Sequence, residues 1–218
     1  MFAIGHFALG YLTGKGSSKA LKTKINLPLL LAVSVIPDVD LLLEIVNPTV
    51  FMHRGLTHSL VTFTVLMIPF FIIYRKQAVP YYAALLSHSL IGDYFTGGVG
   101  LFWPISQDWF GNKWLAIGSL GDVAAELILF AIATAIMFKA GDLQTLLRPK
   151  NHNFVLVIAF FAVLGPMIST EAIESNLPIE LLFPSVFWLI IFASSMLLEL
   201  WDKLRKPPTT IAASKYVS

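Results

Sequence analysis

The sequence contains no cysteine, and only 13% of its 218 residues are charged. Without thiols the chain can form neither a disulfide nor a thiolate-bound metal cluster, so any metal must be held by His, Asp or Glu. A soluble domain has roughly 25% charged residues. Here 56% of the residues are hydrophobic, and the mean hydropathy is +0.76. This composition indicates a polytopic membrane protein.

Apolar runs of nearly membrane-spanning length predict an all-α protein with about seven membrane-inserted helices. The runs lie at about 1–14, 27–46, 57–74, 78–96, 119–138, 152–170 and 181–200. We expect residues 1–206 to form a single transmembrane helical domain. Residues 207–218 are expected to form a disordered cytoplasmic tail.

The basic residues indicate how these runs cross the membrane. Of the 15 Lys and Arg, all except Arg54 and Lys113 follow the first, third, fifth or seventh run. Because positive charge concentrates on the cytoplasmic side, the amino terminus is predicted outside and the carboxyl terminus inside. The location expected is the inner or plasma membrane, with lipid as environment or substrate. Topology accounts for the basic residues, so no nucleic-acid binding is expected.

Ionisable groups gather at one predicted depth of the membrane, between its middle and its outer surface. Such groups inside a membrane are costly, so they are read as a functional site by default. Different runs bring them to this outward-facing layer, and the candidate ligands are His6, Asp38, His53, His58, His88, Asp93, Asp122 and Glu126.

The motif Pro37-Asp38-Val39-Asp40 interrupts the second run. Proline removes a backbone donor and breaks a helix, which frees carbonyl groups beside the carboxylates. The motif predicts one or two metal ligands at a broken helix. The alternative is that Asp38 or Asp40 caps a second short helix.

The motif His53-Arg54-Gly55-Leu56-Thr57-His58-Ser59 precedes the third run, which Thr57 or Ser59 could cap. Neutral imidazole is a common metal ligand, and Arg54 offers a fork of donors to a phosphate. The alternative is an interfacial cluster that meets lipid phosphates.

Two further pairs occur in the fourth and fifth runs. His88 and Asp93 are five residues apart, so they share a helix face only if a π-bulge at Gly92, or a helix end there, aligns them. A helix–helix hydrogen bond is the alternative for His88. Asp122 and Glu126 do share a face, where a cation would relieve their repulsion. Asp122 could instead complement the helix dipole.

These motifs resemble those of the YdjM-like inner-membrane proteins, which are described as predicted metal-dependent hydrolases. The resemblance covers roughly residues 1–105. One spacing departs from the family, which usually has His-x3-Asp where this chain has His88-x4-Asp93. The matching segments are Gly5-His6, Pro37-Asp38-Val39-Asp40, His53-Arg54-Gly55-Leu56-Thr57-His58-Ser59, and Ser87-His88 followed by Asp93, Thr96 and Leu101-Phe102-Trp103-Pro104.

A more distant resemblance is to zinc-dependent phospholipase C and its nuclease relatives. Their ligands run His, Asp, His, His-x3-Asp and His-x3-Glu, and a three-zinc cluster on a helical fold cleaves phosphodiesters. The order here is similar, with Asp122 in place of a His. The resemblance implies two or three metal ions, zinc above all, with manganese or magnesium as alternatives.

Together these features predict a membrane-embedded metal-dependent hydrolase that cleaves a phosphoester of a lipid or lipid-linked substrate through a metal-activated water. Asp40 or Glu126 is the candidate general base, and Arg54 the candidate phosphate-binding residue. A divalent-cation or proton transporter that uses the same His and Asp cluster is the main alternative. A third is a structural metal protein with a closed ligand shell.

Overall fold

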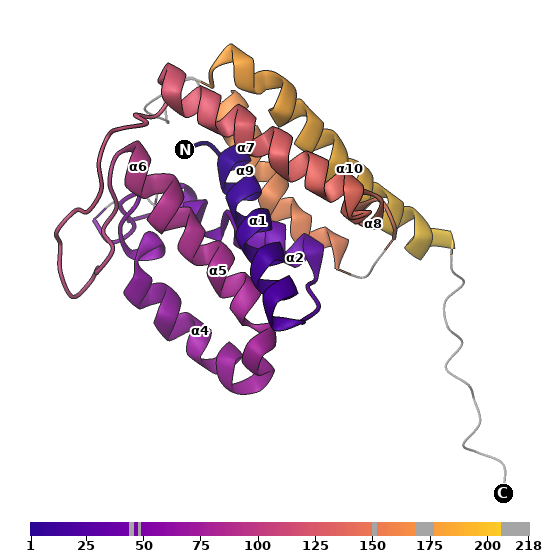
Figure 1. Ribbon diagram of the computed structural model, residues 1–218, viewed down its shortest axis with the longest axis horizontal. Coiled ribbons are helices and arrows are strands. Elements are labelled where there is room, and N and C mark those ends of the chain that lie inside the picture. The colour runs from indigo at the N-terminus through magenta and orange to yellow at the C-terminus, as the bar shows by residue number, and fades with distance from the viewer. Residues whose placement is uncertain (44–45, 48, 150–151, 169–176, 206–218) are drawn as a thin grey trace, which may run out of the picture.

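The computed structural model describes residues 1–43, 46–47, 49–149, 152–168 and 177–205, and its regular elements there are helices (Figure 1). The expected all-α class is therefore confirmed. The first half of the chain holds α1 (Ala3–Leu21), α2 (Leu27–Val33), η1 (Ile36–Val39), α3 (Asp40–Leu43), η2 (Leu56–His58), α4 (Leu60–Tyr74), η3 (Arg75–Gln77), α5 (Val79–Ser87), η4 (His88–Asp93) and α6 (Tyr94–Thr96). The second half holds α7 (Leu120–Lys139), α8 (Asp142–Leu146), η5 (Asn153–Val155), α9 (Leu156–Ile168), η6 (Ile179–Leu181) and α10 (Leu182–Arg205).

Helix α1 lies in the middle of the bundle and contacts α2, α5 and α7 (Figure 1). A Cβ atom on Gly10 would overlap the side chain of Ser34, and one on Gly14 would overlap that of Leu30. Glycine at these two positions therefore lets α1 approach α2 closely, as small residues do at helix crossings in membranes. The close approach brings the two amino-terminal segments that carry candidate ligands together.

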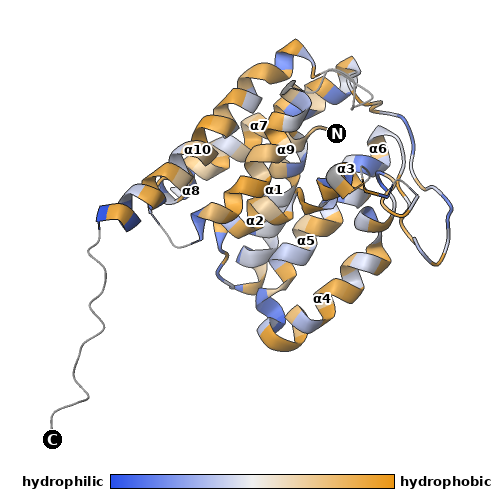
Figure 2. Ribbon diagram, turned by 180° about the vertical axis from the view of Figure 1, so that it is seen from behind, coloured by the Kyte–Doolittle hydropathy of each residue, from blue (hydrophilic) through white to orange (hydrophobic). Residues whose placement is uncertain are grey.

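Three described segments are long and apolar enough to cross a membrane, namely Leu60–Gln77, Leu120–Lys139 and Ile179–Arg205, and a shorter apolar segment spans Asn153–Met167. Figure 2 shows these helices as mostly hydrophobic. The count of seven spans is not confirmed. Each predicted run does contain helix, but the second run breaks into short pieces, and α1 carries lysines and serines in its second half.

The predicted interruption of the second run is confirmed. Helix α2 ends at Val33, and the chain continues as the 3₁₀-helix η1 around Pro37 and then as the short helix α3. Proline cannot donate a backbone hydrogen bond and disfavours helical geometry at the residue before it, so the α-helix ends ahead of the proline. The break places Asp38 and Asp40 inside the bundle instead of along a continuous helix.

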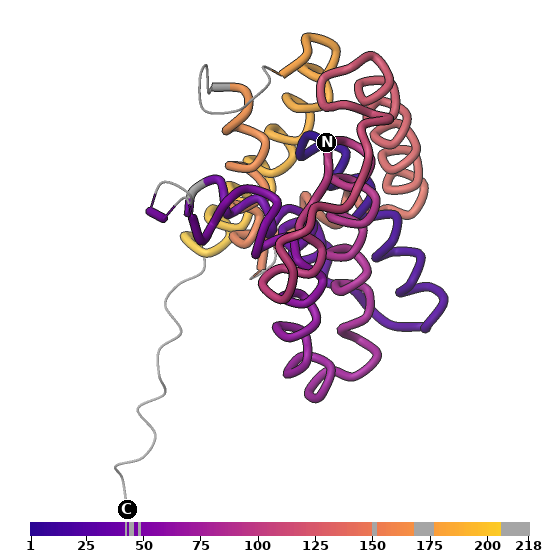
Figure 3. The backbone as a smooth tube through the Cα atoms, turned by 90° about the vertical axis from the view of Figure 1, so that its left-hand side faces the viewer, coloured from indigo at the N-terminus to yellow at the C-terminus, as the bar shows by residue number. Residues whose placement is uncertain are grey.

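The segment between α6 and α7 covers the turn that precedes α4. The backbone N–H of Gly100 donates to the Arg54 carbonyl at 2.8 Å, and that of Leu60 donates to the Leu101 carbonyl at 2.9 Å. The Ser59 hydroxyl donates to the carbonyl oxygens of Leu101 and Trp103. In Figure 3 this segment lies on the side that faces the viewer. It fixes the turn that carries His53, Arg54 and His58.

The predicted tail at 207–218, and the domain boundary before it, lie outside the described residues.

The close crossing at Gly10 predicts that this glycine cannot be replaced. We expect Gly10→Ala to lower the free energy of unfolding by about 1–3 kcal/mol, because the added methyl group overpacks the contact with Ser34. Gly16 lies on the same helix with no atom near its Cβ position, so it provides the matched control. Gly16→Ala should raise stability by up to about 1 kcal/mol, since alanine favours helix.

Unfolding of the detergent-solubilised protein by a denaturing detergent measures both variants. Equal stability of Gly10→Ala and Gly16→Ala would show that α1 and α2 do not cross closely.

Candidate metal centre

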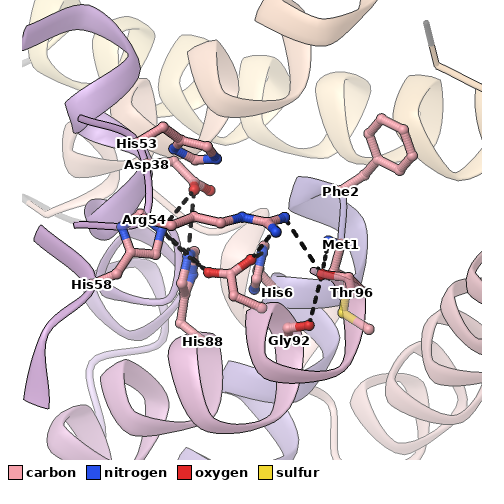
Figure 4. A network of polar contacts seen from close by, with 12 residues as sticks. Met1, Phe2, His6, Asp38, His53, Arg54, His58, His88, Gly92 and Thr96 are labelled. Atoms are coloured by element: carbon pink, nitrogen blue, oxygen red, sulfur yellow. Dashed lines mark hydrogen bonds and ion pairs between the residues drawn. The ribbon is translucent and has the colours of Figure 1, made fainter. Parts of the chain in front are cut away.

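Six side chains form two neighbouring groups whose ligand atoms are close enough to share metal ions (Figure 4). Within each group these atoms lie within 4.8 Å of one another. The first group comprises His6, His88 and Asp93, and the second comprises Asp38, His53 and His58. The Nε2 atoms of His58 and His88 lie 3.0 Å apart, so the two groups adjoin.

The first group depends on a local change of helix type. Residues His88–Asp93 form the π-helix η4, in which hydrogen bonds link residues five apart. His88 and Asp93 are also five apart, so they lie on one face, with His88 Nε2 at 3.3 Å from Asp93 Oδ2. The π-bulge expected around Gly92 is therefore confirmed, and it aligns a pair that a regular α-helix would separate.

His6 reaches this pair from α1. Its ring stacks on the ring of His88, with centroids 3.6 Å apart and an angle of 12° between the planes. A Cβ atom on Gly92 would overlap the His6 ring, so the glycine leaves room for it. His6 Nε2 lies 3.8 Å from Asp93 Oδ1. His6, His88 and Asp93 are buried.

The second group is built by the broken helix and by the turn before α4. Asp38 Oδ1, in η1, lies 3.4 Å from the Nε2 atoms of both His58 and His88. His58 ends η2, directly before α4 begins. Ser59 caps α4 by accepting hydrogen bonds from the N–H groups of Val61 and Thr62, as one of the two predicted caps.

Asp40 lies behind the second group and is fully buried. Its Oδ1 pairs with His53 Nδ1 at 3.0 Å. Its Oδ2 accepts hydrogen bonds from the Arg54 backbone N–H at 3.1 Å and from the Thr57 hydroxyl at 2.7 Å, and lies 3.1 Å from His58 Nδ1. Both carboxylate oxygens are thus engaged in orienting the two histidines and the turn between them.

The hydrogen bonds of the histidines indicate where their protons lie. His88 Nδ1 lies 2.8 Å from the Ser34 carbonyl, which can only accept, so the proton is on Nδ1. The carboxylate of Asp40 favours the same tautomer in His58. The lone pairs of both Nε2 atoms then face each other, together with the oxygens of Asp38 and Asp93. A cation shared by these atoms, or a proton on one of the Nε2 atoms, would offset the repulsion between the lone pairs.

The spacing of these atoms fits a metal ion. Ligand atoms around a tetrahedral zinc lie about 3.3 Å from one another, given bond lengths of about 2.0–2.1 Å. The facing nitrogen and oxygen atoms of His58, His88, Asp38 and Asp93 lie 3.0–3.4 Å apart, and His6 Nε2 lies 3.8 Å from Asp93 Oδ1. In addition, His6 Nδ1 and Asp93 Oδ2 are buried without a hydrogen-bond partner. The set of imidazoles and carboxylates therefore fits zinc or a similar divalent ion.

Arg54 lies across the cluster (Figure 4). One terminal nitrogen is 3.3 Å from Asp93 Oδ1 and 3.4 Å from the Thr96 hydroxyl, while its Nε has no partner. The residue has a φ of 65°, a conformation that its two backbone hydrogen bonds, to Asp40 and from Gly100, hold in place. The contacts with Asp93 and Thr96 hold its guanidinium group beside the candidate ligands.

The structure does not bring Asp122 or Glu126 into either group. Glu126 accepts hydrogen bonds from the backbone N–H groups of Phe2 at 2.6 Å and Gly5 at 3.2 Å, at the start of α1. Asp122 Oδ2 accepts one from Gly118 at 2.9 Å. Their predicted metal-binding roles stay predictions, whereas the hydrogen bonds of Glu126 tie α7 to the helix that carries His6.

Sequence reasoning missed three partners of the site. The sequence indicates Thr57 only as a possible helix cap, yet its hydroxyl group donates to Asp40. It indicates Thr96 only as part of a motif, yet the hydroxyl group of Thr96 accepts a hydrogen bond from Arg54. The Ser34 carbonyl, which orients His88, is one of the groups that the proline-broken helix releases. The proline was a signal for freed carbonyls, but the sequence could not show which residue would use them.

Comparisons with known proteins relate the chain to inner membrane proteins. The chain is 36% identical over 131 residues to the inner membrane protein YbcI of Escherichia coli (strain K12), a match that covers 52% of this chain and 73% of that protein. No solved structure matches it. The model of the YdjM inner membrane protein family matches residues 1–176, which include both ligand groups. The chain therefore belongs to the YdjM inner membrane protein family.

Proposed function

We propose that this membrane protein is a metal-dependent hydrolase that cleaves phosphoesters. The observation that carries the proposal is the pair of Nε2 atoms 3.0 Å apart, from His58 and His88, with carboxylate oxygens of Asp38 and Asp93 at 3.3–3.4 Å. These four residues and His6 would hold one or more divalent ions. Such an ion supplies Lewis acidity and makes a water molecule nucleophilic at neutral pH.

A catalytic role is favoured over a structural one by the ligand set and its exposure. Structural zinc sites are closed, usually by cysteine, whereas catalytic sites keep an open position. The present groups contain only nitrogen and oxygen donors, and the side chains of His53 and Asp38 are 33% and 18% exposed. Substrate and water can therefore reach one edge of the cluster.

Arg54 supports a phosphoester as the substrate. Its guanidinium group presents a planar fork of donors that matches phosphate oxygens, and its Nε is free of protein partners. Because one terminal nitrogen already contacts Asp93 and Thr96, the group would bind a phosphate next to the candidate ligands without a large loss of side-chain freedom.

Asp40 is better suited to positioning than to the role of general base. Both of its oxygens are occupied by His53, Thr57 and the Arg54 backbone. A carboxylate that binds Nδ1 of a metal-binding histidine fixes its tautomer and the orientation of its ring. Glu126 likewise uses both oxygens to hold the start of α1. We therefore assign both carboxylates to the support of the ligands.

Removal of a ligand should abolish both metal content and hydrolysis. The purified protein is expected to retain stoichiometric zinc or manganese and to hydrolyse at least one ester of a panel that contains aryl phosphates, phosphatidic acid and phosphatidylglycerol. His58→Ala and Asp38→Ala should lose the metal and reduce hydrolysis by more than the roughly 100-fold upper range of a second-shell change.

His152→Ala provides the control, because His152 is exposed and lies outside both groups. Elemental analysis and product release measure the outcomes. Metal-loaded protein that hydrolyses none of these esters but carries the ion into vesicles would favour the transporter instead.

Asp40→Asn should weaken the site without removing a ligand. The amide would no longer hold the two histidines through Nδ1, so metal affinity is expected to fall by about 10–100-fold. Asp108→Asn is a suitable control, because Asp108 is an exposed residue bonded only within its own turn. Competition with a chelator of known affinity measures both. Unchanged affinity in Asp40→Asn would contradict the positioning role.

Deletion of Leu90 should leave the metal site intact. The π-helix accommodates one residue more than the family's usual His-x3-Asp spacing, so its removal would restore an α-helix with His88 and Asp93 four apart on one face. Deletion of Ala83 in α5 is the control, because it would rotate the helix by about 100°. If the Leu90 deletion loses as much metal as the Ala83 deletion, the π-helix does more than accommodate one extra residue between His88 and Asp93.

A further inference from the structure

The candidate centre opens toward the surface at only one of its described edges. The side chains of His6, His58, His88 and Asp93 are at most 2% exposed, whereas those of His53 and Asp38 are 33% and 18% exposed. Figure 4 shows His53, Asp38 and Arg54 on the same side of the cluster, away from η4. A substrate that reaches the ligands must therefore pass His53 and Asp38.

Exposed apolar side chains lie close to both of these residues in the sequence. Ile36 and Val39 are 38% and 39% exposed, and Val50 and Met52 are 43% and 38% exposed. Because residues three apart in a 3₁₀-helix lie above one another, Ile36 and Val39 share one face of η1, next to Asp38 in the chain. We call these four side chains the apolar rim.

The apolar rim and the charged residues beside it suit different parts of a ligand. Arg54 and the candidate ligands suit an anionic phosphoester group, which gains nothing from exposed aliphatic side chains. The rim suits a hydrocarbon chain, because contact between two apolar surfaces buries no unpaired polar group. A molecule that satisfies both carries an anionic head and an apolar tail.

We propose that the substrate is a phospholipid of the surrounding bilayer, whose head reaches Arg54 while its acyl chains lie on the apolar rim. This rests on the proposed function and names its substrate class. In the hydrolysis, the oxygen of water forms a bond to phosphorus, and a P–O ester bond breaks. One proton of the water passes to the released alcohol.

Chain length is the variable that tests the rim. We compare dibutyryl and dioctanoyl forms of phosphatidic acid and phosphatidylglycerol at a fixed detergent concentration, with the metal-loaded wild-type protein. The kcat/KM of the cleaved lipid should be at least about tenfold higher for the dioctanoyl form, because each buried methylene group contributes to binding.

Variants of the rim should reduce this advantage selectively. Val39→Ser and Met52→Gln are expected to lower kcat/KM several-fold for the dioctanoyl lipid and to leave the dibutyryl lipid unchanged. Ile132→Ser is the matched control, since Ile132 is 46% exposed on α7, away from the rim, and should leave the ratio unchanged. Thermal unfolding of the three variants verifies that each is folded.

The outcomes separate this inference from the proposed function. Equal kcat/KM for both chain lengths, or rim variants that affect both lipids equally, would overturn the rim as a lipid contact while hydrolysis stands. If the metal-loaded protein cleaves neither these lipids nor the aryl phosphates, the proposed function fails and the inference with it.

Discussion

The structure depends on a buried cluster in which imidazole nitrogens and carboxylate oxygens converge to within 3.0–3.4 Å of one another. His58 and His88 each direct Nε2 toward the other, and Asp38 and Asp93 add carboxylate oxygens beside them. Removing such groups from water costs several kcal/mol for each charge, which only a shared cation or very good pairing repays. The rest of the fold serves to hold these atoms together.

Several departures from regular helix deliver the ligands. The break after α2 turns Asp38 inward and releases the Ser34 carbonyl for His88, and the π-helix η4 aligns His88 with Asp93. Such local deviations from regular helix lower stability by themselves. They persist only where contacts with the surrounding structure hold them, and this is common at functional sites. Gly10 on α1, Gly92 in η4, Asp40 in α3 and Glu126 on α7 provide these surroundings.

The sequence predicted much of this arrangement because apolar length, proline and spacing are local signals. The presence of helix in each apolar run and the break at Pro37 were predicted from such signals. The Ser59 cap of α4 and the π-bulge were each one of two alternatives that the sequence offered. The partners of Glu126 could not be predicted, because a spacing of four residues shows that it shares a face with Asp122 and not what that face meets. In the structure it meets backbone N–H groups more than 120 residues away. The number of spans also depends on more than local apolar length, because α1 is central and partly polar.

The chain belongs to the YdjM inner membrane protein family and holds a buried cluster of imidazoles and carboxylates among apolar helices. Whether this cluster binds a metal ion is the central question. Anomalous scattering measured at the zinc and manganese edges, on crystals of the metal-supplied protein, answers it most directly. The account predicts one or more peaks within bonding distance of His58, His88, Asp38 and Asp93. An absence of any peak there, or a peak only beside Asp122 and Glu126, would contradict it.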